Sequence, residues 1–345
     1  MKNKTNFRCA QPNITAQMHE HALQISSFNG IELYQEPRKL VQGIIEVFEK
    51  YDFSFPVLGY DVYNIEAEAM GQQISFKKEG SPQIDRENLL IQSDADLDKL
   101  YLKKSIIEKG RFKFVILATE EYIKRTNLFP PLQFTAPFSL AAQVYNIENL
   151  IIKMNSDAKF VHDLMKRITY NVLIPWIDYQ QEYFLEARPI LGADAMASPP
   201  NLTYSMLEEF VVPYIKILKE ELGSEVGVVN WWGDSYFSDP IEFYKLKKEV
   251  SPNNKIIRIQ DPDLAKLNLD KIVKFINKNN LKLTLGLGAS FISLQSSKDI
   301  HERVIKYCEA GKKVKEFTLY FCNISYDTSP AKIKQAISSA RECFA

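Results

Sequence analysis

The sequence has few of the residues that hold metals or cross-link chains. Its 345 residues include four cysteines and four histidines. The cysteines, at positions 9, 308, 322 and 343, form no Cys-x-x-Cys pair, and a chain of this length does not depend on a disulfide framework. A phosphate-binding loop is also missing, because Gly286-Leu287-Gly288 lacks the downstream glycine and lysine that such loops use. These absences indicate a reducing compartment, and we expect a cytoplasmic location.

An excess of charge of either sign is absent as well. Lysine and arginine together number 43, as do aspartate and glutamate, so the formal net charge is zero. Without a basic field, we expect no nucleic-acid partner and no binding to anionic membranes. The N-terminus is polar and no long apolar run follows it, so we expect neither a signal peptide nor a membrane span. Monomer and homodimer both stay open.

Hydrophobic residues make up 46% of the chain, and they follow two alternating patterns. Short β-branched runs predict strands, and the amphipathic stretches between them predict helices. Regular alternation of the two is typical of a parallel α/β architecture, and about eight units favour a (β/α)8 TIM barrel over an open sheet. We predict a single barrel domain over residues 1–345. Strands are expected at 31–34, 56–63, 132–138, 194–198, 227–232, 255–260, 283–288 and 317–322, and helices at 40–51, 158–169, 205–222, 267–279, 298–311 and 330–341.

Residues 74–130 interrupt this alternation, and we predict an insertion there. Ser81-Pro82-Gln83 favours a turn within it. The apolar, β-branched residues 113–117 favour an extra strand.

The acidic residues that follow the predicted strand 56–63 are the first candidates for chemistry. In a barrel of this class the site lies at the C-terminal ends of the strands. Asp61 and Glu68 are therefore predicted to be catalytic carboxylates. The alternative is that Asp61 caps a helix, while Glu66 and Glu68 lie on its solvated first turn.

The other predicted strand ends supply a third acid, a thiol and a set of binding residues. Asp234 and Cys322 join the catalytic candidates. Aromatic rings beside them could enclose a methoxylated aromatic or attract a quaternary ammonium group, and core packing is the alternative. The residues predicted to bind substrate are Phe138, Ser139, Ser198, Asn230, Trp231, Trp232, Tyr236 and Gln260.

Several segments resemble the uroporphyrinogen decarboxylase superfamily, from about Leu40 to the C-terminus. They are residues 61–71, 136–142, 192–194, 210–214 and 319–340. The resemblance implies a (β/α)8 barrel with a deep cleft at its C-terminal face. The superfamily includes the decarboxylase of haem biosynthesis and the cobamide-dependent methyltransferases. The run Glu-Ala-Glu-Ala-x-Gly that starts at Glu66 is closer to the methyltransferases.

The resemblance also implies a zinc site, which this sequence retains only in part. Zinc methyltransferases of the superfamily bind the metal through His-x-Cys after one strand and through a later cysteine. Asn230 stands in place of the histidine and Trp232 in place of the first cysteine, so only Cys322 matches. A single thiolate does not make a zinc site. A non-standard site that uses Asp61, Glu68, Asp234 or Cys322 stays open, because carboxylates also bind zinc.

We therefore predict an enzyme, a cobamide-dependent methyltransferase. It would move a methyl group between a small methylated substrate, such as a methoxylated aromatic or a methylated amine, and a corrinoid. No Asp-x-His-x-x-Gly motif is visible, so a partner corrinoid protein must supply the corrinoid. The corrinoid is then the nucleophile, and a carboxylic acid or a tyrosine can protonate the leaving group of an ether.

Two alternatives stay open. The first is a decarboxylase of a tetrapyrrole poly-acid. Asp61 resembles the essential aspartate of that branch, but its arginine-rich N-terminal signature is absent, so Arg8, Arg38, Arg111 and Arg188 would have to gather at the cleft. The second is a non-catalytic member that binds a corrinoid or tetrapyrrole. Salt-bridged carboxylates and a cleft filled by Trp231 and Trp232 would favour it.

Overall fold

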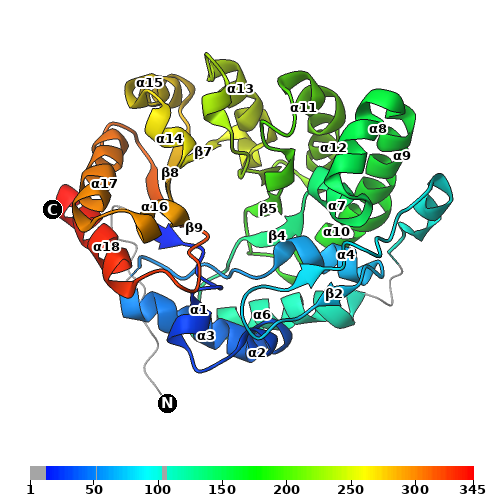
Figure 1. The fold of residues 1–345 in the computed structure, drawn as a ribbon, viewed down its shortest axis with the longest axis horizontal. Coiled ribbons are helices and arrows are strands. Elements are labelled where there is room, and N and C mark those ends of the chain that lie inside the picture. The colour runs from blue at the N-terminus through cyan, green and yellow to red at the C-terminus, as the bar shows by residue number, and fades with distance from the viewer. Residues whose placement is uncertain (1–12, 52, 103–106) are drawn as a thin grey trace.

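The computed structural model describes residues 13–51, 53–102 and 107–345. Its principal strands form two parallel sheets, with the strand orders β1-β9-β8-β7 and β4-β5-β6 (Figure 1). The strands are β1 (Asn13–Ala16), β4 (Leu132–Thr135), β5 (Ile190–Ala193), β6 (Val226–Val228), β7 (Ile256–Gln260), β8 (Lys282–Gly288) and β9 (Phe317–Cys322).

An extended segment, residues 53–61, completes the ring between β1 and β4. On one side the backbone N–H of Ser54 donates to the Ile14 carbonyl at 3.0 Å. On the other side the Gln133 amide donates to the Leu58 carbonyl at 2.5 Å. The segment therefore occupies the position of a strand in the barrel wall. The predicted (β/α)8 barrel is confirmed.

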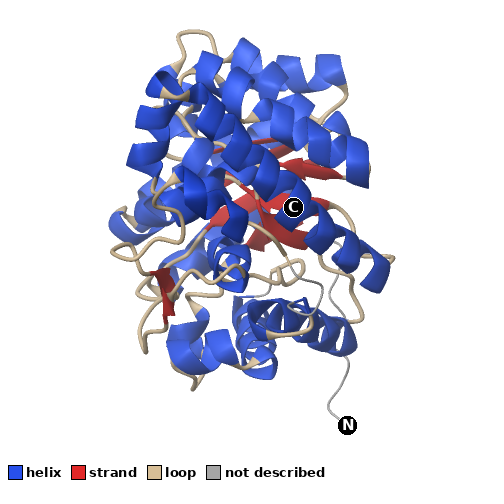
Figure 2. Cartoon of the chain, turned by 90° about the vertical axis from the view of Figure 1, so that its right-hand side faces the viewer, coloured by secondary structure: helices blue, strands red, loops and turns tan. Residues whose placement is uncertain are grey.

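Helices surround the ring (Figures 1 and 2). Their inward faces are apolar, as in α15, where Ile272, Val273, Phe275 and Ile276 are buried. The longer helices are α3 (Pro37–Tyr51), α6 (Gly110–Thr126), α7 (Pro137–Tyr145), α8 (Ile147–Ser156), α9 (Ala158–Ile168), α10 (Ile174–Tyr183), α11 (Tyr204–Phe210), α12 (Val212–Leu222), α13 (Ile241–Val250), α15 (Leu269–Asn279), α17 (Ser297–Gly311) and α18 (Pro330–Phe344). None of the described helices is long and apolar enough to cross a membrane.

Short elements join these parts. The helical ones are α1 (Ala22–Ile25), α2 (Gly30–Gln35), α4 (Ile65–Ala69), α14 (Asp263–Lys266) and α16 (Ala289–Leu294), with single turns η1 (Val62–Asn64), η2 (Asp94–Lys99), η4 (Ala195–Ala197), η5 (Asp234–Tyr236) and η6 (Pro252–Asn254), and the π-helical turn η3 (Thr169–Leu173). A small antiparallel pair, β2 (Ile74–Ser75) and β3 (Gln83–Ile84), lies apart from the ring (Figure 2).

Three of the predicted strands are wrong, and a fourth, 56–63, is extended without being a regular strand and passes into the helical turn η1 at Val62. Residues 31–34 lie in α2, which starts at a capping box between Asn29 and Glu32. Residues 113–117 lie in α6, so the predicted insertion is shorter than 74–130, and its last part is a regular barrel helix. The strand expected at 194–198 lies earlier in the sequence, because β5 covers Ile190–Ala193 and the predicted residues contain the helical turn η4.

The side chains of β7 alternate between the two sides of the wall. Ile257 and Ile259 are buried, with exposed fractions of 1% and 0%, whereas Arg258 and Gln260 are partly exposed and face the barrel axis. Gly286 of β8 lies beside Gln260 in register. An added Cβ at Gly286 would lie 2.5 Å from the Gln260 Cβ, so only glycine leaves room for this side chain.

A pair of glycine substitutions tests this packing. A Cβ at Gly227 in β6 would meet the Val250 carbonyl oxygen at 2.5 Å and the Pro252 nitrogen at 2.6 Å, which are backbone atoms. Gly227→Ala should therefore lower the free energy of unfolding by about 1–3 kcal/mol. Gly43→Ala is the control, because a Cβ there meets the side chain of Leu33 at 3.1 Å and alanine favours a helix interior. Urea unfolding should show a loss for Gly227→Ala only, and equal effects would contradict the packing.

Candidate functional site

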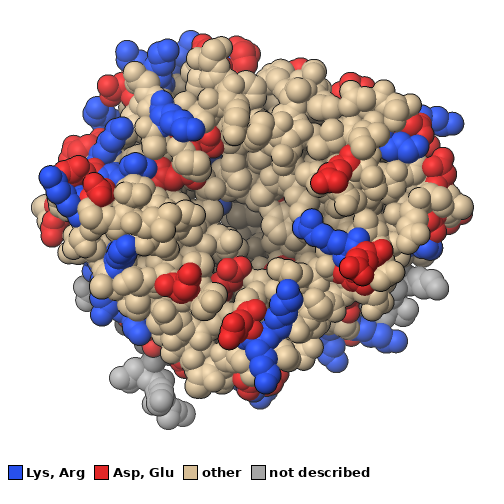
Figure 3. All heavy atoms as spheres, viewed as in Figure 1, with Lys and Arg blue, Asp and Glu red and all other residues tan. Residues whose placement is uncertain are grey.

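The C-terminal ends of the strands, where a barrel of this kind places its site, meet around the barrel axis. The molecular surface is hollowed at its centre, where the ring of strands surrounds the axis (Figures 1 and 3). The polar groups described below follow β5, β6, β7, β9 and the segment 53–61.

Tyr63 is the best-placed proton donor at these strand ends. Its hydroxyl oxygen accepts a hydrogen bond from the Ala195 N–H at 3.0 Å and another from the Asn230 amide nitrogen at 3.1 Å. The other end of the Asn230 amide accepts from the Asp194 N–H at 2.8 Å, which fixes the orientation of the amide. Because Asn230 must donate to Tyr63, the hydroxyl proton of Tyr63 stays available for a ligand.

The electrostatic surroundings keep Tyr63 protonated. Burial raises the pKa of its hydroxyl to about 12, and the nearby Asp194 and Cys322 act in the same direction. The hydrogen bonds from Ala195 and Asn230 oppose this shift because they stabilise the phenolate. Tyr63 is partly exposed, so a ligand in the barrel can reach it. The arrangement suits a general acid that works at neutral pH.

Asp194 joins three of the loops around the site. Its carboxylate accepts hydrogen bonds from the Ser139 N–H at 3.1 Å, the Ser139 hydroxyl at 2.9 Å and the Trp231 indole N–H at 2.9 Å. Ser139 lies in the first turn of α7, where a helix terminus attracts negative charge. Burial nevertheless dominates, and it raises the pKa of Asp194 to about 7.

Glu66 is fully buried, so the expectation of a solvated first turn is wrong for it. The Thr135 hydroxyl lies 2.8 Å from the Val62 carbonyl oxygen and 2.7 Å from the Glu66 Oε2. A hydroxyl has one proton, and a carbonyl can only accept. When Thr135 donates to Val62, Glu66 must carry a proton to bond with Thr135. This agrees with burial, which raises the pKa of Glu66 to about 7.

Asp61, the first predicted catalytic acid, forms an ion pair with Arg111. The Asn64 amide also donates to its carboxylate, at 3.3 Å. Burial raises the pKa of Asp61 to about 6, and Arg111 opposes the rise, so the carboxylate is mainly ionised at pH 7. Asp61 precedes the turn η1 but makes no capping hydrogen bond with its side chain. A catalytic role for Asp61 stays a prediction, and this geometry favours a structural one.

Glu68, the second predicted acid, lies in α4, and its carboxylate is close to the start of α6. An added Cβ at Gly110 would lie 3.4 Å from its Oε2 atom. Gly110 is the first residue of that helix, whose N-terminus carries a partial positive charge. A position near this helix terminus stabilises the Glu68 carboxylate, so its presence there does not require a catalytic role.

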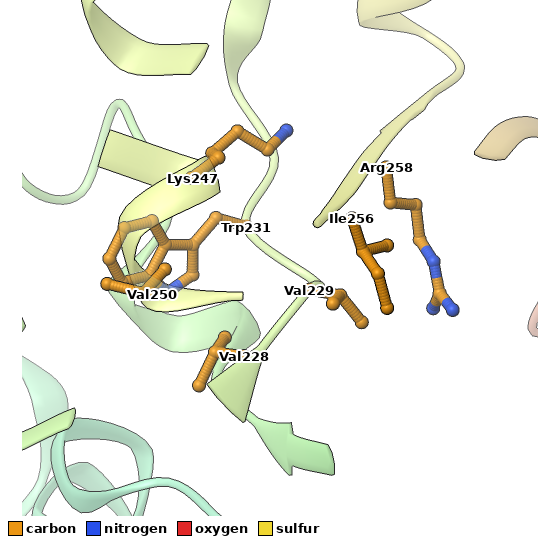
Figure 4. Close-up of a pocket in the computed structure, with 7 residues that line it drawn as sticks. All are labelled: Val228, Val229, Trp231, Lys247, Val250, Ile256 and Arg258. Carbon is orange, nitrogen blue, oxygen red and sulfur yellow. The ribbon is translucent and has the colours of Figure 1, made fainter. Parts of the chain in front are cut away.

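Asp234, the third predicted acid, is fully buried in an ion pair with Lys247 of α13. The Lys247 Nζ lies 2.9 Å and 3.0 Å from the two carboxylate oxygens. Burial raises the pKa of Asp234 and lowers that of Lys247, and the ion pair opposes both shifts. A narrow crevice beside this pair separates β6 from β7 (Figure 4). It is lined by Val228, Val229, Trp231, Lys247, Val250, Ile256 and Arg258.

Cys322 and Gln260 are partly exposed at the ends of β9 and β7. Burial raises the pKa of the Cys322 thiol to about 11, while Arg258 and Gln260 lower it. The Gln260 Oε1 is buried and has no hydrogen-bond partner. These two residues therefore lie where the sequence predicts them, within the barrel.

The residues present do not fit the family zinc site. Both ends of the Asn230 amide are engaged, by Asp194 and Tyr63, and Trp232 has no ligand atom. Cys322 is then the one family ligand left. In the described part of the chain, no three residues among histidine, cysteine, aspartate and glutamate gather as metal ligands.

The residues predicted to bind substrate fall into two groups. Phe138, Ser139 and Trp231 have exposed fractions of 0%, 0% and 1%, so they support the site from behind. Ser198 belongs with them, because its hydroxyl accepts from the Trp232 N–H at 2.9 Å. The accessible residues are Asn230, Trp232, Gln260 and Tyr236, the last of which is 65% exposed.

The arginines named for a poly-acid site do not gather among the described residues. Arg111 pairs with Asp61, and Arg188 pairs with Glu225 at 3.1 Å near the start of β5. Arg38 is exposed on α3, and Arg8 lies outside the described residues.

Sequence reasoning missed Tyr63, Asp194 and Glu66 as site residues. The sequence offers a signal for Tyr63 and Asp194, because both fall in the segments that carry the family resemblance. Their roles depend on partners such as Asn230, which is 167 positions from Tyr63. Spacing along the chain gives no signal for such a pair.

The comparisons with known proteins agree with this architecture. The family model described as Uroporphyrinogen decarboxylase (URO-D) matches residues 13–343. Among solved structures, a methyltransferase from Methanosarcina mazei is similar, with a TM-score of 0.75. The likeness covers 94% of this chain and 90% of that chain at 15% sequence identity, which shows a shared fold. No curated protein matches the sequence.

Glu66→Gln should change how stability depends on pH. The folded-state pKa of about 7 lies above the ordinary value of 4.5, so the stabilising contribution of Glu66 is full below about pH 4.5 and is lost as the pH rises toward 7. Glutamine keeps both hydrogen bonds to Thr135 without a charge. The variant should gain stability over the wild type between these pH values, by up to about 3 kcal/mol.

Urea unfolding at a series of pH values measures this gain. Some pH dependence should persist in the variant, because the pKa of Asp194 is raised in the same direction. Parallel stability curves for variant and wild type would contradict a protonated Glu66.

Asp194→Ala should destabilise the loops around the site. It leaves the Ser139 N–H, the Ser139 hydroxyl and the Trp231 indole without an acceptor. We expect a loss of about 2–4 kcal/mol, because buried unpaired donors are costly. Asp194→Asn keeps one acceptor oxygen and should lose less. Chemical unfolding followed by tryptophan fluorescence measures both, and equal losses would contradict this account.

Proposed function

Because the chain belongs to the uroporphyrinogen decarboxylase family, we propose that it is a methyltransferase acting between a small methylated substrate and a corrinoid carried by a partner protein. The family places the site in the cleft at the C-terminal ends of the strands, where Tyr63 and Asn230 lie. The likeness to a methyltransferase supports this branch of the family. The arginines, which do not gather at the cleft among the described residues, speak against a poly-acid substrate.

The observation that carries the proposal is the hydroxyl of Tyr63. Two donors hold its oxygen, so its own proton points to the ligand. Transfer of a methyl group from an ether breaks the methyl–oxygen bond and leaves both electrons on the oxygen. Tyr63 gives that oxygen its proton, and the product leaves as an alcohol or a phenol. The corrinoid, when its protein is bound, supplies the electron pair that takes up the methyl group.

The phenolate that remains on Tyr63 is stabilised by the same donors. The Ala195 N–H and the Asn230 amide already aim at the oxygen, so no rearrangement is needed when the charge forms. Solvent then returns the proton, because the pKa of about 12 favours the phenol at neutral pH. Asn230, in the place of the family histidine, thus acts on the acid of the reaction instead of on a metal.

Tyr63→Phe is the test. The variant keeps the ring and loses the proton, so we expect methyl transfer to slow by about 10²–10⁴-fold. The measurement is anaerobic absorbance of a Co(I) corrinoid protein mixed with methoxylated aromatics, methylamines, betaines or methyl thiols. Tyr170→Phe, on the outer turn η3, is the matched control and should keep the full rate.

The pH profile provides a second readout. With Tyr63 as the acid, the rate of demethylation should not fall between neutral pH and pH 9, since the pKa of its hydroxyl is about 12. No methylation of the corrinoid with any donor, in a mixture that a known methyltransferase can use, would overturn the proposal. The decarboxylase and the non-catalytic binding protein would then be the readings to test.

A further inference from the structure

Arg258 is a cation inside the barrel that pairs with no acid among the described residues. Its guanidinium lies 4.5 Å from the centroid of the Tyr320 ring. The Arg258 Nε is buried and has no hydrogen-bond partner. The side chain extends from β7 away from Trp231 and Lys247 (Figure 4). The Arg258 side chain therefore points toward the barrel axis and not toward the ion pair of Asp234 and Lys247.

Three buried acids of the barrel are engaged with other cations. Among the described residues, Asp61 pairs with Arg111, Asp234 with Lys247, and Asp261 with Arg303 at 3.0 Å. None of the ion pairs in that part of the chain includes Arg258. A charge in a partly buried position is costly when nothing neutralises it, and among the described residues no acid pairs with this arginine, which leaves its guanidinium free to bind an anion.

Glycine in β8 creates the space around Arg258. Gly286 lies in register between Gln260 of β7 and Tyr320 of β9, so no side chain separates these strands there. The guanidinium can thus reach the Tyr320 ring across β8. The Tyr320 hydroxyl donates a hydrogen bond to the Gln17 Oε1 atom at 3.1 Å, which fixes the ring beneath the guanidinium.

The same region is close to the proton donor. Arg258 lowers the pKa of the Cys322 thiol, and Cys322 in turn raises the pKa of the Tyr63 hydroxyl, so the three side chains lie in one region of the barrel.

We propose that Arg258 binds an anionic group, a carboxylate or a group of similar shape, on the methylated substrate. This inference rests on the proposed function and narrows it to acidic methyl donors. The planar guanidinium can bind a carboxylate through two parallel hydrogen bonds, and a lysine cannot. Tyr320 holds the guanidinium from the other side, so the ligand finds it already oriented.

The experiment compares two probes that differ only in charge. Para-methoxybenzoate carries the anion, and para-methoxybenzamide replaces it with a neutral amide. Calorimetric titration of the whole protein should show the acid binding at least about tenfold more tightly, equal to about 1.4 kcal/mol. Arg258→Gln should abolish this preference, and Arg258→Lys should restore only part of it. Arg188→Gln, at the opposite end of the barrel, is the matched control and should keep it.

A thermal measurement guards against a misfolded variant and against a poor choice of probe. Arg258→Gln should unfold at a temperature no lower than the wild type, because it removes an unpaired charge. Acetate, sulfate and para-methoxybenzoate, at constant ionic strength, should raise the melting temperature of the wild type more than that of the variant. If none of them does so, or if acid and amide bind the wild type equally, the proposal is wrong.

These readouts are separate from methyl transfer. Preference for the acid without transfer to the corrinoid would leave Arg258 as an anion site and overturn the proposed reaction. Transfer from neutral donors that is insensitive to Arg258→Gln would keep the reaction and overturn the anion site.

Discussion

The site depends on one buried carboxylate, that of Asp194. It accepts hydrogen bonds from α7 through Ser139 and from the loop after β6 through Trp231. The backbone N–H of the same residue donates to Asn230, and Asn230 in turn holds Tyr63. A carboxylate has two acceptor oxygens, whereas an asparagine of the same size has one. The side chain of Asp194 therefore joins the loops, and its backbone orients the proton donor.

The barrel wall separates its ion pairs from its axis. Asp61 with Arg111 and Asp234 with Lys247 lie within the packing, where each charge has a partner. Among the described groups that reach the axis are the phenol of Tyr63, the amides of Asn230 and Gln260, the thiol of Cys322 and the guanidinium of Arg258. This set matches a ligand that brings its own anion and receives a proton from an uncharged acid.

Sequence alone predicts the class of fold because the alternation of strands and helices is a local property. It fails where the pattern is weak, as at residues 113–117, whose apolar residues belong to the buried face of the long helix α6. For the site, it places Asn230, Gln260 and Cys322 near strand ends, where the structure also has them. It does not distinguish a free acid from a paired one, because the partner of Asp61 is 50 positions away in Arg111. Tyr63 stands only two residues after Asp61, yet its importance depends on contacts with distant loops.

The hydrogen-bonded ring has a seam. The strand ladders of the described residues form two arcs, β4-β5-β6 and β7-β8-β9-β1, and the crevice lined by Val228 and Ile256 lies between β6 and β7. Asn230 extends from the first arc, and Arg258 belongs to the second. The spacing between Asn230, which holds the acid, and Arg258 is therefore set by side-chain packing across the seam, because no ladder of the described strands joins β6 to β7. A small sliding of one arc against the other would change the length of ligand that the barrel accepts, while each arc keeps its own hydrogen bonds.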